Sequence, residues 1–230
     1  MSQLLLKIFL LFLISTCNFA SSASQIETIT PEFIQSKIDL LNARQGLDEA
    51  VKTNVLKQYQ AALDNLTSNA QSLTHINDFH QALRQAPIQT KTLQKEIEQT
   101  LIKIGKDLPE DFSHLRVEEL EQRLITEKDK VNQLDTQLKK VEADLALQNS
   151  RAIKIREETL QAQQLIEESR KKLELSAAPS DSKFEYEARQ LYLKTLIQTQ
   201  LSELKELDAE SVSQPARIEL LKTQLQLLDI

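Results

Sequence analysis

A seven-residue repeat of apolar side chains runs from Val117 to Ser176 and constrains the fold of this 230-residue chain more than any other feature. With Val117 counted as position a, most a and d positions of the repeat are apolar. A repeat sustained this long is typical of a helix that packs along one narrow seam against another helix. At about 1.5 Å per residue, such a helix is about 90 Å long. The repeat therefore predicts an elongated, all-α protein.

The predicted coiled-coil seam consists of the bulky aliphatic residues at the a and d positions. These are Val117, Leu120, Leu124, Val131, Leu134, Leu138, Val141, Leu145, Ile155, Ile166 and Leu173. Polar residues occupy other d positions, at Glu127, Gln148, Ser169 and Ser176. We therefore expect looser packing or a changed register near the middle of this helix.

The composition supports the same fold class. The chain holds 2 glycines, 5 prolines and no tryptophan, and 4% of its residues are aromatic. Strands favour β-branched and aromatic residues, and hairpins favour glycine, so sheets are disfavoured. The fold class predicted is all-α, an elongated helical bundle with long antiparallel coiled-coil helices.

Residues 1–23 have the pattern of a secretory signal peptide. Lys7 precedes an apolar stretch that is too short to span a membrane, and small residues lead to Ala23. Cleavage after Ala23 would place the mature chain in the periplasm. Cys17 invites comparison with a lipoprotein processing site, but the threonine before it fits that site poorly.

Residues 24–104 are predicted to form an N-terminal helical segment. Thr30 and the following proline mark the start of a short helix. Gly46 can end that helix in the left-handed conformation, and Asp48 can cap the next one. Pro87 should kink or break the second helix, which then continues to residue 104.

Residues 105–113 read as a linker, and residues 114–230 as a coiled-coil hairpin with a closing helix. A second short linker, 177–183, favours an antiparallel return onto the long helix. Ser213 and Pro215 should start one more helix. The apolar pattern of this last helix continues up to Ile230, so we expect the polypeptide to be longer.

No set of residues in the sequence has the pattern of a catalytic, metal or cofactor site. His75, His80 and His114 are too scattered to form a metal site. The many carboxylates flank the predicted seam. Paired catalytic carboxylates need a desolvated cleft that makes their pKa values differ, and a coiled coil offers none. The net charge of -6 opposes nucleic-acid binding. We expect no enzyme activity, no cofactor and no small-molecule substrate.

Three segments carry a family resemblance. They are YQAAL from Tyr59, LPEDFSHLRVEELEQRL ending at Leu124, and ARIELLKTQLQLL ending at Leu228. Together with the order of the helices, they resemble the periplasmic porin-type domain of the large, potassium-efflux type mechanosensitive channels of the small-conductance family. That family usually has a proline-glutamate-arginine-alanine turn midway along the long segment. This chain has Asn149-Ser150-Arg151-Ala152, so we expect its helix to run straight through.

The resemblance implies that such a segment precedes transmembrane helices and a pore in a homo-oligomeric channel that opens under membrane tension. The partners expected are other copies of the chain or the downstream channel body, with cell-envelope components as a further possibility. A free periplasmic scaffold or holdase-like chaperone is the alternative function. The excess of acidic residues argues against a chaperone of the common basic type.

Overall fold

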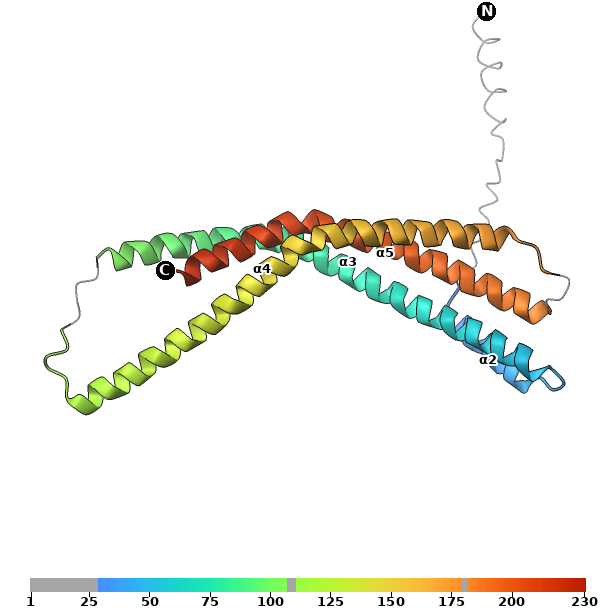
Figure 1. The fold of residues 1–230 in the computed structure, drawn as a ribbon, viewed down its shortest axis with the longest axis horizontal. Helices are drawn as coiled ribbons and strands as arrows, with labels where there is room; N and C mark the ends of the chain where they lie inside the picture. Colours follow the sequence, from blue (N-terminus) through green and yellow to red (C-terminus); the bar gives the residue numbers. More distant parts are fainter. Residues whose placement is uncertain (1–28, 107–110, 179–181) are drawn as a thin grey trace, which may run out of the picture.

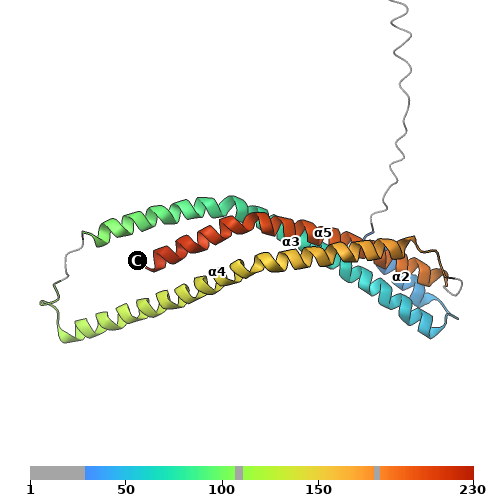
Figure 2. The same ribbon diagram turned by 45° about the horizontal axis from the view of Figure 1, so that its top comes forward.

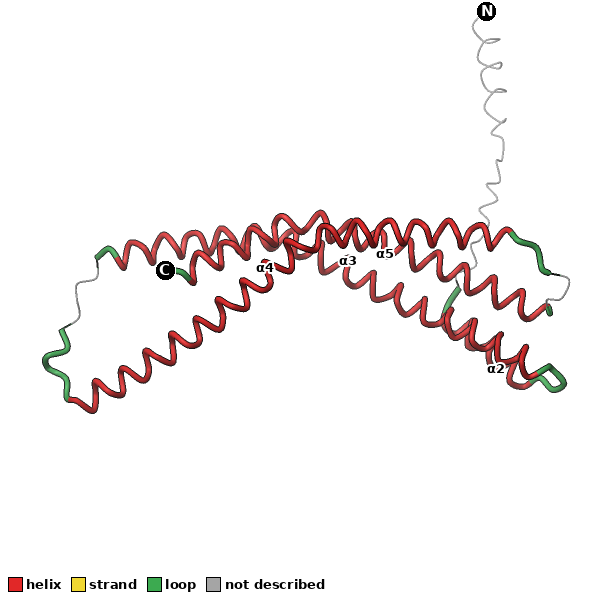
Figure 3. The backbone as a smooth tube through the Cα atoms, in the orientation of Figure 1, coloured by secondary structure: helices red, strands yellow, loops and turns green. Residues whose placement is uncertain are grey.

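The structure is a computed structural model that describes residues 29–106, 111–178 and 182–230. The signal peptide expected at residues 1–23 lies outside this part of the chain. Figure 3 shows helices joined by loops, without strands among the residues described. The helices are α2 (Pro31–Ala43), α3 (Glu49–Ile104), α4 (Val117–Glu174) and α5 (Lys183–Leu228). The all-α prediction is confirmed.

The first two helices begin and end as their capping residues indicate. The Thr30 hydroxyl accepts a hydrogen bond from the Phe33 amide at 3.2 Å at the start of α2. Gly46 has a φ of 77° in the connection that follows. The Asp48 carboxylate accepts bonds from the first amides of α3. Side-chain oxygens thus satisfy amides that have no partner within the helix.

Helix α3 continues through Pro87, so of the kink or break expected there, the break does not occur. Pro87 is exposed, while Ala86 and Thr90 beside it are buried. The Thr90 hydroxyl also donates to the Ala86 carbonyl at 2.9 Å. Because residues on both sides of the proline are buried, the helix stays continuous there. In both views the helix bends in its middle part (Figures 1 and 2). A bend is the common way for a long helix to accommodate a proline.

Helix α4 runs without interruption through Asn149-Ser150-Arg151-Ala152, as expected from the missing proline. Its start is fixed by the Arg116 amide, which donates to the Glu119 carboxylate at 2.9 Å. Of the linker before it, residues 107–110 lie outside the part described. The long helix predicted from the heptad repeat is confirmed within two residues of its expected end.

Helix α5 is also longer than expected, because Ser213 and Pro215 lie inside it and do not start a separate helix. The Ser213 hydroxyl and the Arg217 guanidinium both donate to the carbonyl of Glu210, at 2.9 and 3.5 Å. Ser213 and Gln214 are buried in the bundle. Packing and side-chain hydrogen bonds therefore keep α5 continuous where the local sequence favours a boundary.

The four helices form an elongated assembly in which α5 packs against both α3 and α4 (Figures 1 and 2). Contacts between side chains fix the directions. From one contacting pair to the next, the residue numbers increase in both α3 and α5, so these two helices are parallel. Pairs between α4 and α5 run in opposite order, so the expected antiparallel return is confirmed. The defining pairs are Asn65–Thr195 and His75–Glu206 for α3 with α5, and Leu173–Gln190 and Arg151–Glu210 for α4 with α5.

The largest apolar core lies at the end of the assembly where α2 folds back on α3. Tyr59 is fully buried there, and burial raises the pKa of its hydroxyl to about 12. The core consists of Ile34, Leu41, Val55, Tyr59, Ala62, Leu66, Ala188 and Leu191. This end is therefore the most firmly packed. Among the residues described, no helix combines the length and the apolar character that crossing a membrane requires.

Candidate helix-packing surface and its polar crossing

The heptad frame read from the sequence identifies the face of α4 that packs in the structure. Every residue of α4 that is buried or half-buried lies at position a, d or g of that frame. The fully buried ones are Ile155, Ala162, Ile166 and Ser169. The contact face thus follows one continuous stripe along the helix, as a seven-residue repeat requires.

The predicted seam residues fall into three groups in this structure. Ile155 and Ile166 are buried against the bundle. The four with intermediate burial are Leu138, Val141, Leu145 and Leu173. The five nearest the start of α4 are exposed, namely Val117, Leu120, Leu124, Val131 and Leu134. Their role as a coiled-coil seam stays a prediction.

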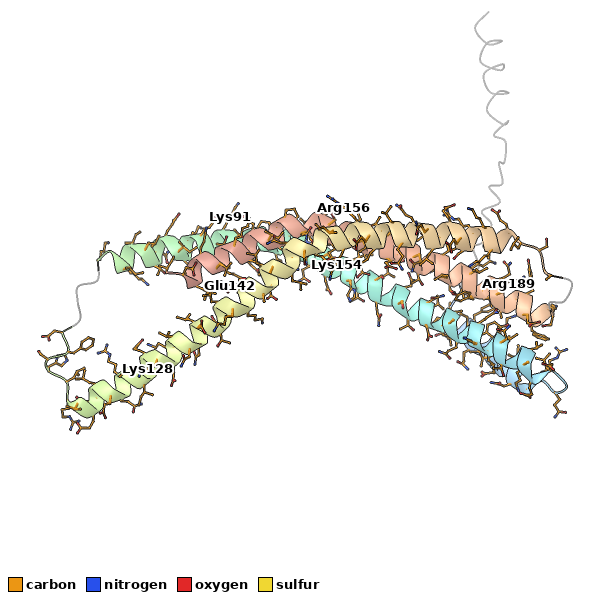
Figure 4. The ribbon with its side chains drawn as sticks, in the orientation of Figure 1. Lys91, Lys128, Glu142, Lys154, Arg156 and Arg189 are labelled. Atoms are coloured by element: carbon orange, nitrogen blue, oxygen red, sulfur yellow. The ribbon has the colours of Figure 1, made fainter. Side chains whose placement is uncertain are left out.

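The first part of α4, residues 117–137, is called the α4 arm from here on. Every residue of the arm is exposed. In both ribbon views the arm runs away from α3 and α5, and Figure 4 shows Lys128 on it, far from the other helices. The side chains of Val117 and Val131 are 67% and 63% accessible. An apolar stripe of this length on a free helix is typical of an interaction surface.

Further along α4, in the part that packs on the bundle, Arg151 meets Glu210 of α5 at a crossing of the two helices. The Arg151 Nε and Nη2 atoms donate to the two Glu210 carboxylate oxygens, each at 2.9 Å. The Nη1 atom donates to Glu158 at 2.7 Å. A bidentate pair of this kind is strong and fixes geometry as well as charge. It therefore sets the register of α4 on α5.

Burial and hydrogen bonding shape the electrostatics of this crossing. Hydrogen bonds to Glu210 and then Glu158 raise the pKa of Arg151, and the bond from Arg151 lowers the pKa of Glu158. Burial lowers the pKa of Arg217, whose guanidinium lies 5.0 Å from the centre of the Phe79 ring. The ring face attracts the cation, so α3 contributes to the same cluster.

A backbone contact adds to the crossing. The Gln214 side chain donates from Nε2 to the carbonyl of Gln148 at 2.6 Å. Gln148 occupies a d position, where the sequence led us to expect looser packing. The helix stays regular there, and polar contacts take the place of an apolar layer.

Beyond the apolar core that holds Tyr59, Leu66 and Leu191, helices α3 and α5 meet through small and polar side chains. Asn65 donates to the Thr195 hydroxyl at 3.2 Å, and the Thr199 hydroxyl donates to the Asn65 carbonyl at 2.7 Å. One turn further on, Ser202 hydrogen bonds to Asn69. Small side chains at these positions allow the backbones to approach closely. This part of the interface therefore depends on particular small and polar residues and contains few large apolar ones.

The crossing and the α3–α5 interface were both missed from the sequence. The signal for the first was present, since Arg151 and Glu158 lie at consecutive g positions beside the polar d residue Gln148. The signal for the second was weak, because Thr, Ser and Asn give no clear apolar period. His75, expected to be structural or exposed, contacts Glu206 at 2.7 Å on the surface. Within the residues described, no three His, Cys, Asp or Glu side chains come together as a metal site would require.

Comparison with known proteins identifies the domain type. No curated protein and no solved structure matches the chain. Residues 37–230 match the family described as the mechanosensitive ion channel porin domain. The match begins inside α2 and covers α3, α4 and α5, so it includes both the crossing and the arm. The chain therefore belongs to the mechanosensitive ion channel porin domain family.

Proposed function

We propose that the chain is a periplasmic accessory or sensing domain of a mechanosensitive ion channel and that it acts through helix packing. Conduction is assigned to the channel body. The observation that carries the proposal is the family match over residues 37–230, which covers helices α3, α4 and α5. The expected signal peptide supports export, and the family supports a membrane-associated channel.

The shape of the assembly suits a mechanical role. Helix α5 contacts both α3 and α4, so a displacement of either outer helix is transmitted through α5. The bidentate pair of Arg151 and Glu210 ties α4 to α5 near the middle of α4. A force on the α4 arm would act about this point. The domain would then change the tension at which the channel opens.

Deletion in the cell tests the sensing role. In cells that carry this gene, codons 31–230 are removed in frame, and tension-gated currents are recorded from membrane patches. The expected result is a changed opening tension with the conductance of single openings unchanged. Glu210→Gln should change the tension in the same direction, and the exposed Lys139→Met should not. An opening tension equal to that of the unaltered strain in all three cases would overturn the proposal.

The export step has its own test. Alkaline phosphatase, which is active only after export, is fused after Ile230 and compared with the same fusion lacking residues 1–23. Activity should require residues 1–23. Equal activity of both fusions would contradict periplasmic placement by this signal.

The exposed stripe of the α4 arm favours one second candidate, a holdase-like scaffold. Such a protein would grip unfolded clients on apolar surface. Suppression of the aggregation of a heated client protein distinguishes the two functions. The sensing proposal predicts no suppression at equimolar chain, whereas suppression that is lost in Leu124→Asp would favour the scaffold.

A further inference from the structure

A pocket of about 420 Å³ lies where α3, α4 and α5 come together beside the crossing. On α4 it lies between the residues labelled Glu142 and Lys154 in Figure 4. Pockets of a few hundred Å³ are of the size that holds small molecules. The residues of its lining that matter here are Ala82 and Ala86 of α3, Asp144 and Gln148 of α4, and Arg217 and Leu221 of α5.

Two buried polar atoms of this lining have no hydrogen-bond partner among the residues that the structure describes. One is the Oε1 atom of Gln148, which is an acceptor, and the other is the Nε atom of Arg217, which is a donor. Folded proteins rarely leave such atoms unpaired, because a buried polar atom has lost its hydrogen bonds to water. An unpaired acceptor and an unpaired donor in one lining favour a ligand that supplies a partner for each.

The α4 wall of the pocket offers acceptors. Asp144 lies one turn before Gln148, on the same face of the helix. A carboxylate and an amide oxygen side by side suit a group that donates several hydrogen bonds and carries a positive charge. An ammonium group has both properties.

The α5 wall offers a cationic donor. The Nη2 atom of Arg217 lies 3.8 Å from the Glu210 carboxylate and donates to the Glu210 carbonyl at 3.5 Å. Both oxygens of that carboxylate already accept hydrogen bonds from Arg151. Burial is the main cause that lowers the pKa of Arg217, so its positive charge is disfavoured where it lies. A carboxylate beside it would stabilise this charge.

The charges around the pocket argue against a ligand that is only an anion. At the crossing, the two cations Arg151 and Arg217 are matched by the two anions Glu158 and Glu210. Asp144 then adds a negative charge to the lining of the pocket. A ligand that brings one charge of each sign leaves this balance unchanged.

We propose that the pocket binds a small zwitterion of the amino-acid class. Its ammonium group contacts Asp144 and Gln148 on α4, and its carboxylate contacts Arg217 on α5. Ala86 and Leu221 provide apolar surface for an aliphatic side chain. The ligand bridges α4 and α5 beside the crossing, and it is bound without being converted.

The inference goes beyond the proposed function, because binding by the isolated chain requires no channel. A chain that binds no zwitterion but changes the opening tension would remove this inference and leave the proposed function standing. A chain that binds the zwitterion without changing the opening tension would do the reverse. The two failures are therefore distinguishable.

Three matched probes test the pocket. L-valine carries both charged groups, isovalerate lacks the ammonium group, and isobutylamine lacks the carboxylate. Binding to the 230-residue chain is measured by equilibrium dialysis and by the side-chain Nε–H signal of Arg217 in NMR spectra, which is assigned from its absence in Arg217→Lys. Valine should bind saturably and shift this signal. It should bind about tenfold more tightly than either analogue, because each analogue lacks one set of charge-assisted hydrogen bonds.

Two variants and a matched control locate the site. Asp144→Asn should weaken valine binding about tenfold and should not weaken isovalerate binding. Gln148→Met should weaken valine binding and raise the urea midpoint of the ligand-free chain, because it removes an unpaired buried acceptor. Asp135→Asn makes the same change as Asp144→Asn at an exposed position on α4 and should leave valine binding unchanged. Circular dichroism checks that each variant keeps the helical signal of the unaltered chain.

Three results would overturn the proposal. The first is the absence of saturable valine binding, even with a more stable Gln148→Met variant, because water alone would then satisfy the pocket. The second is isovalerate or isobutylamine binding that is as tight as valine binding. The third is valine binding that stays undiminished in Asp144→Asn.

Discussion

At the scale of single residues, a few buried polar groups hold α4 and α5 together at their crossing. Glu210 is buried, with a side chain 9% accessible, and its carboxylate accepts hydrogen bonds from the Nε and Nη2 atoms of Arg151. A buried carboxylate of this kind is costly without cationic partners, and Arg151 and Arg217 supply them. The crossing is therefore the place where a small chemical change has the largest structural effect.

Glu210→Gln should lower the free energy of unfolding by about 3 kcal/mol, because it leaves Arg151 and Arg217 without their shared carboxylate. Unfolding in urea, followed by circular dichroism, measures this. The control is Lys139→Met, which removes an exposed ion pair with Asp135 and should have no measurable effect. Equal losses of unfolding free energy in the two variants would show that the crossing contributes no more to stability than an exposed ion pair.

Glu203 provides a prediction about pH. Burial raises its pKa above the ordinary 4.5, with smaller contributions from Glu206 and Glu158. A raised carboxyl pKa means that the charged form destabilises the fold above the folded-state pKa and has no such effect below the unfolded-state value. Glu203→Gln should therefore be more stable than the unaltered chain at pH 7.

The advantage of Glu203→Gln should shrink as pH falls and vanish below pH 4.5, where the unaltered side chain is protonated in both states. Urea midpoints at a series of pH values measure the difference. A difference that stays constant with pH would mean that the charge of Glu203 plays no part.

Single residues also show what could be predicted from the sequence. Thr30 and Asp48 cap their helices as expected, because capping depends on neighbours within four residues. Gly46 has the expected left-handed conformation, but α2 has already ended at Ala43. Arg151 and Glu210 are 59 residues apart, and their pairing depends on how two helices cross. Local patterns hold no information on that crossing.

At the scale of elements, both internal prolines lie within continuous helices. Local preference favours a kink or break at Pro87 and a helix start at Pro215. Each proline is flanked by residues buried in the bundle, such as Ala86 and Ser213. Tertiary packing outweighs local preference here, as it does in most long helices.

Pro87→Ala should stabilise the chain by about 1 to 3 kcal/mol, because it restores an amide donor and removes a steric clash within α3. The urea midpoint measures the effect. Ile88→Ala, at the exposed neighbouring position, serves as the control and should change little. A loss of stability in Pro87→Ala would mean that the proline itself is needed for the bend and for packing on α5.

The α3–α5 interface predicts intolerance of large side chains. Ser202 is buried and hydrogen bonds to Asn69 across the interface. Ser202→Leu should separate the helices and cost about 1 to 3 kcal/mol, as overpacking does. Ser202→Ala should cost about 1 kcal/mol, the value of a lost hydrogen bond. Urea unfolding of both variants measures the contrast, and an equal or smaller cost for leucine would contradict close approach of the backbones.

At the scale of the whole molecule, the short linker 177–183 predicted the antiparallel return of α5, and the seven-residue repeat predicted the all-α class and the length of α4. It could not predict that α5 packs between α3 and α4, because the α3–α5 contacts come from small polar residues such as Thr195 and Thr199. Nor could it distinguish the covered part of the stripe from the uncovered arm. That difference depends on where the neighbouring helices run.

The central claim is that the chain is a long helical assembly with a free arm. Small-angle X-ray scattering of dilute chain, with circular dichroism on the same sample, tests it most directly. The 58 residues of α4 alone span about 87 Å at about 1.5 Å per residue, so we predict a strongly helical particle with a maximum dimension above about 90 Å. A radius of gyration near 17 Å, roughly the value for a compact domain of 230 residues, would contradict the account.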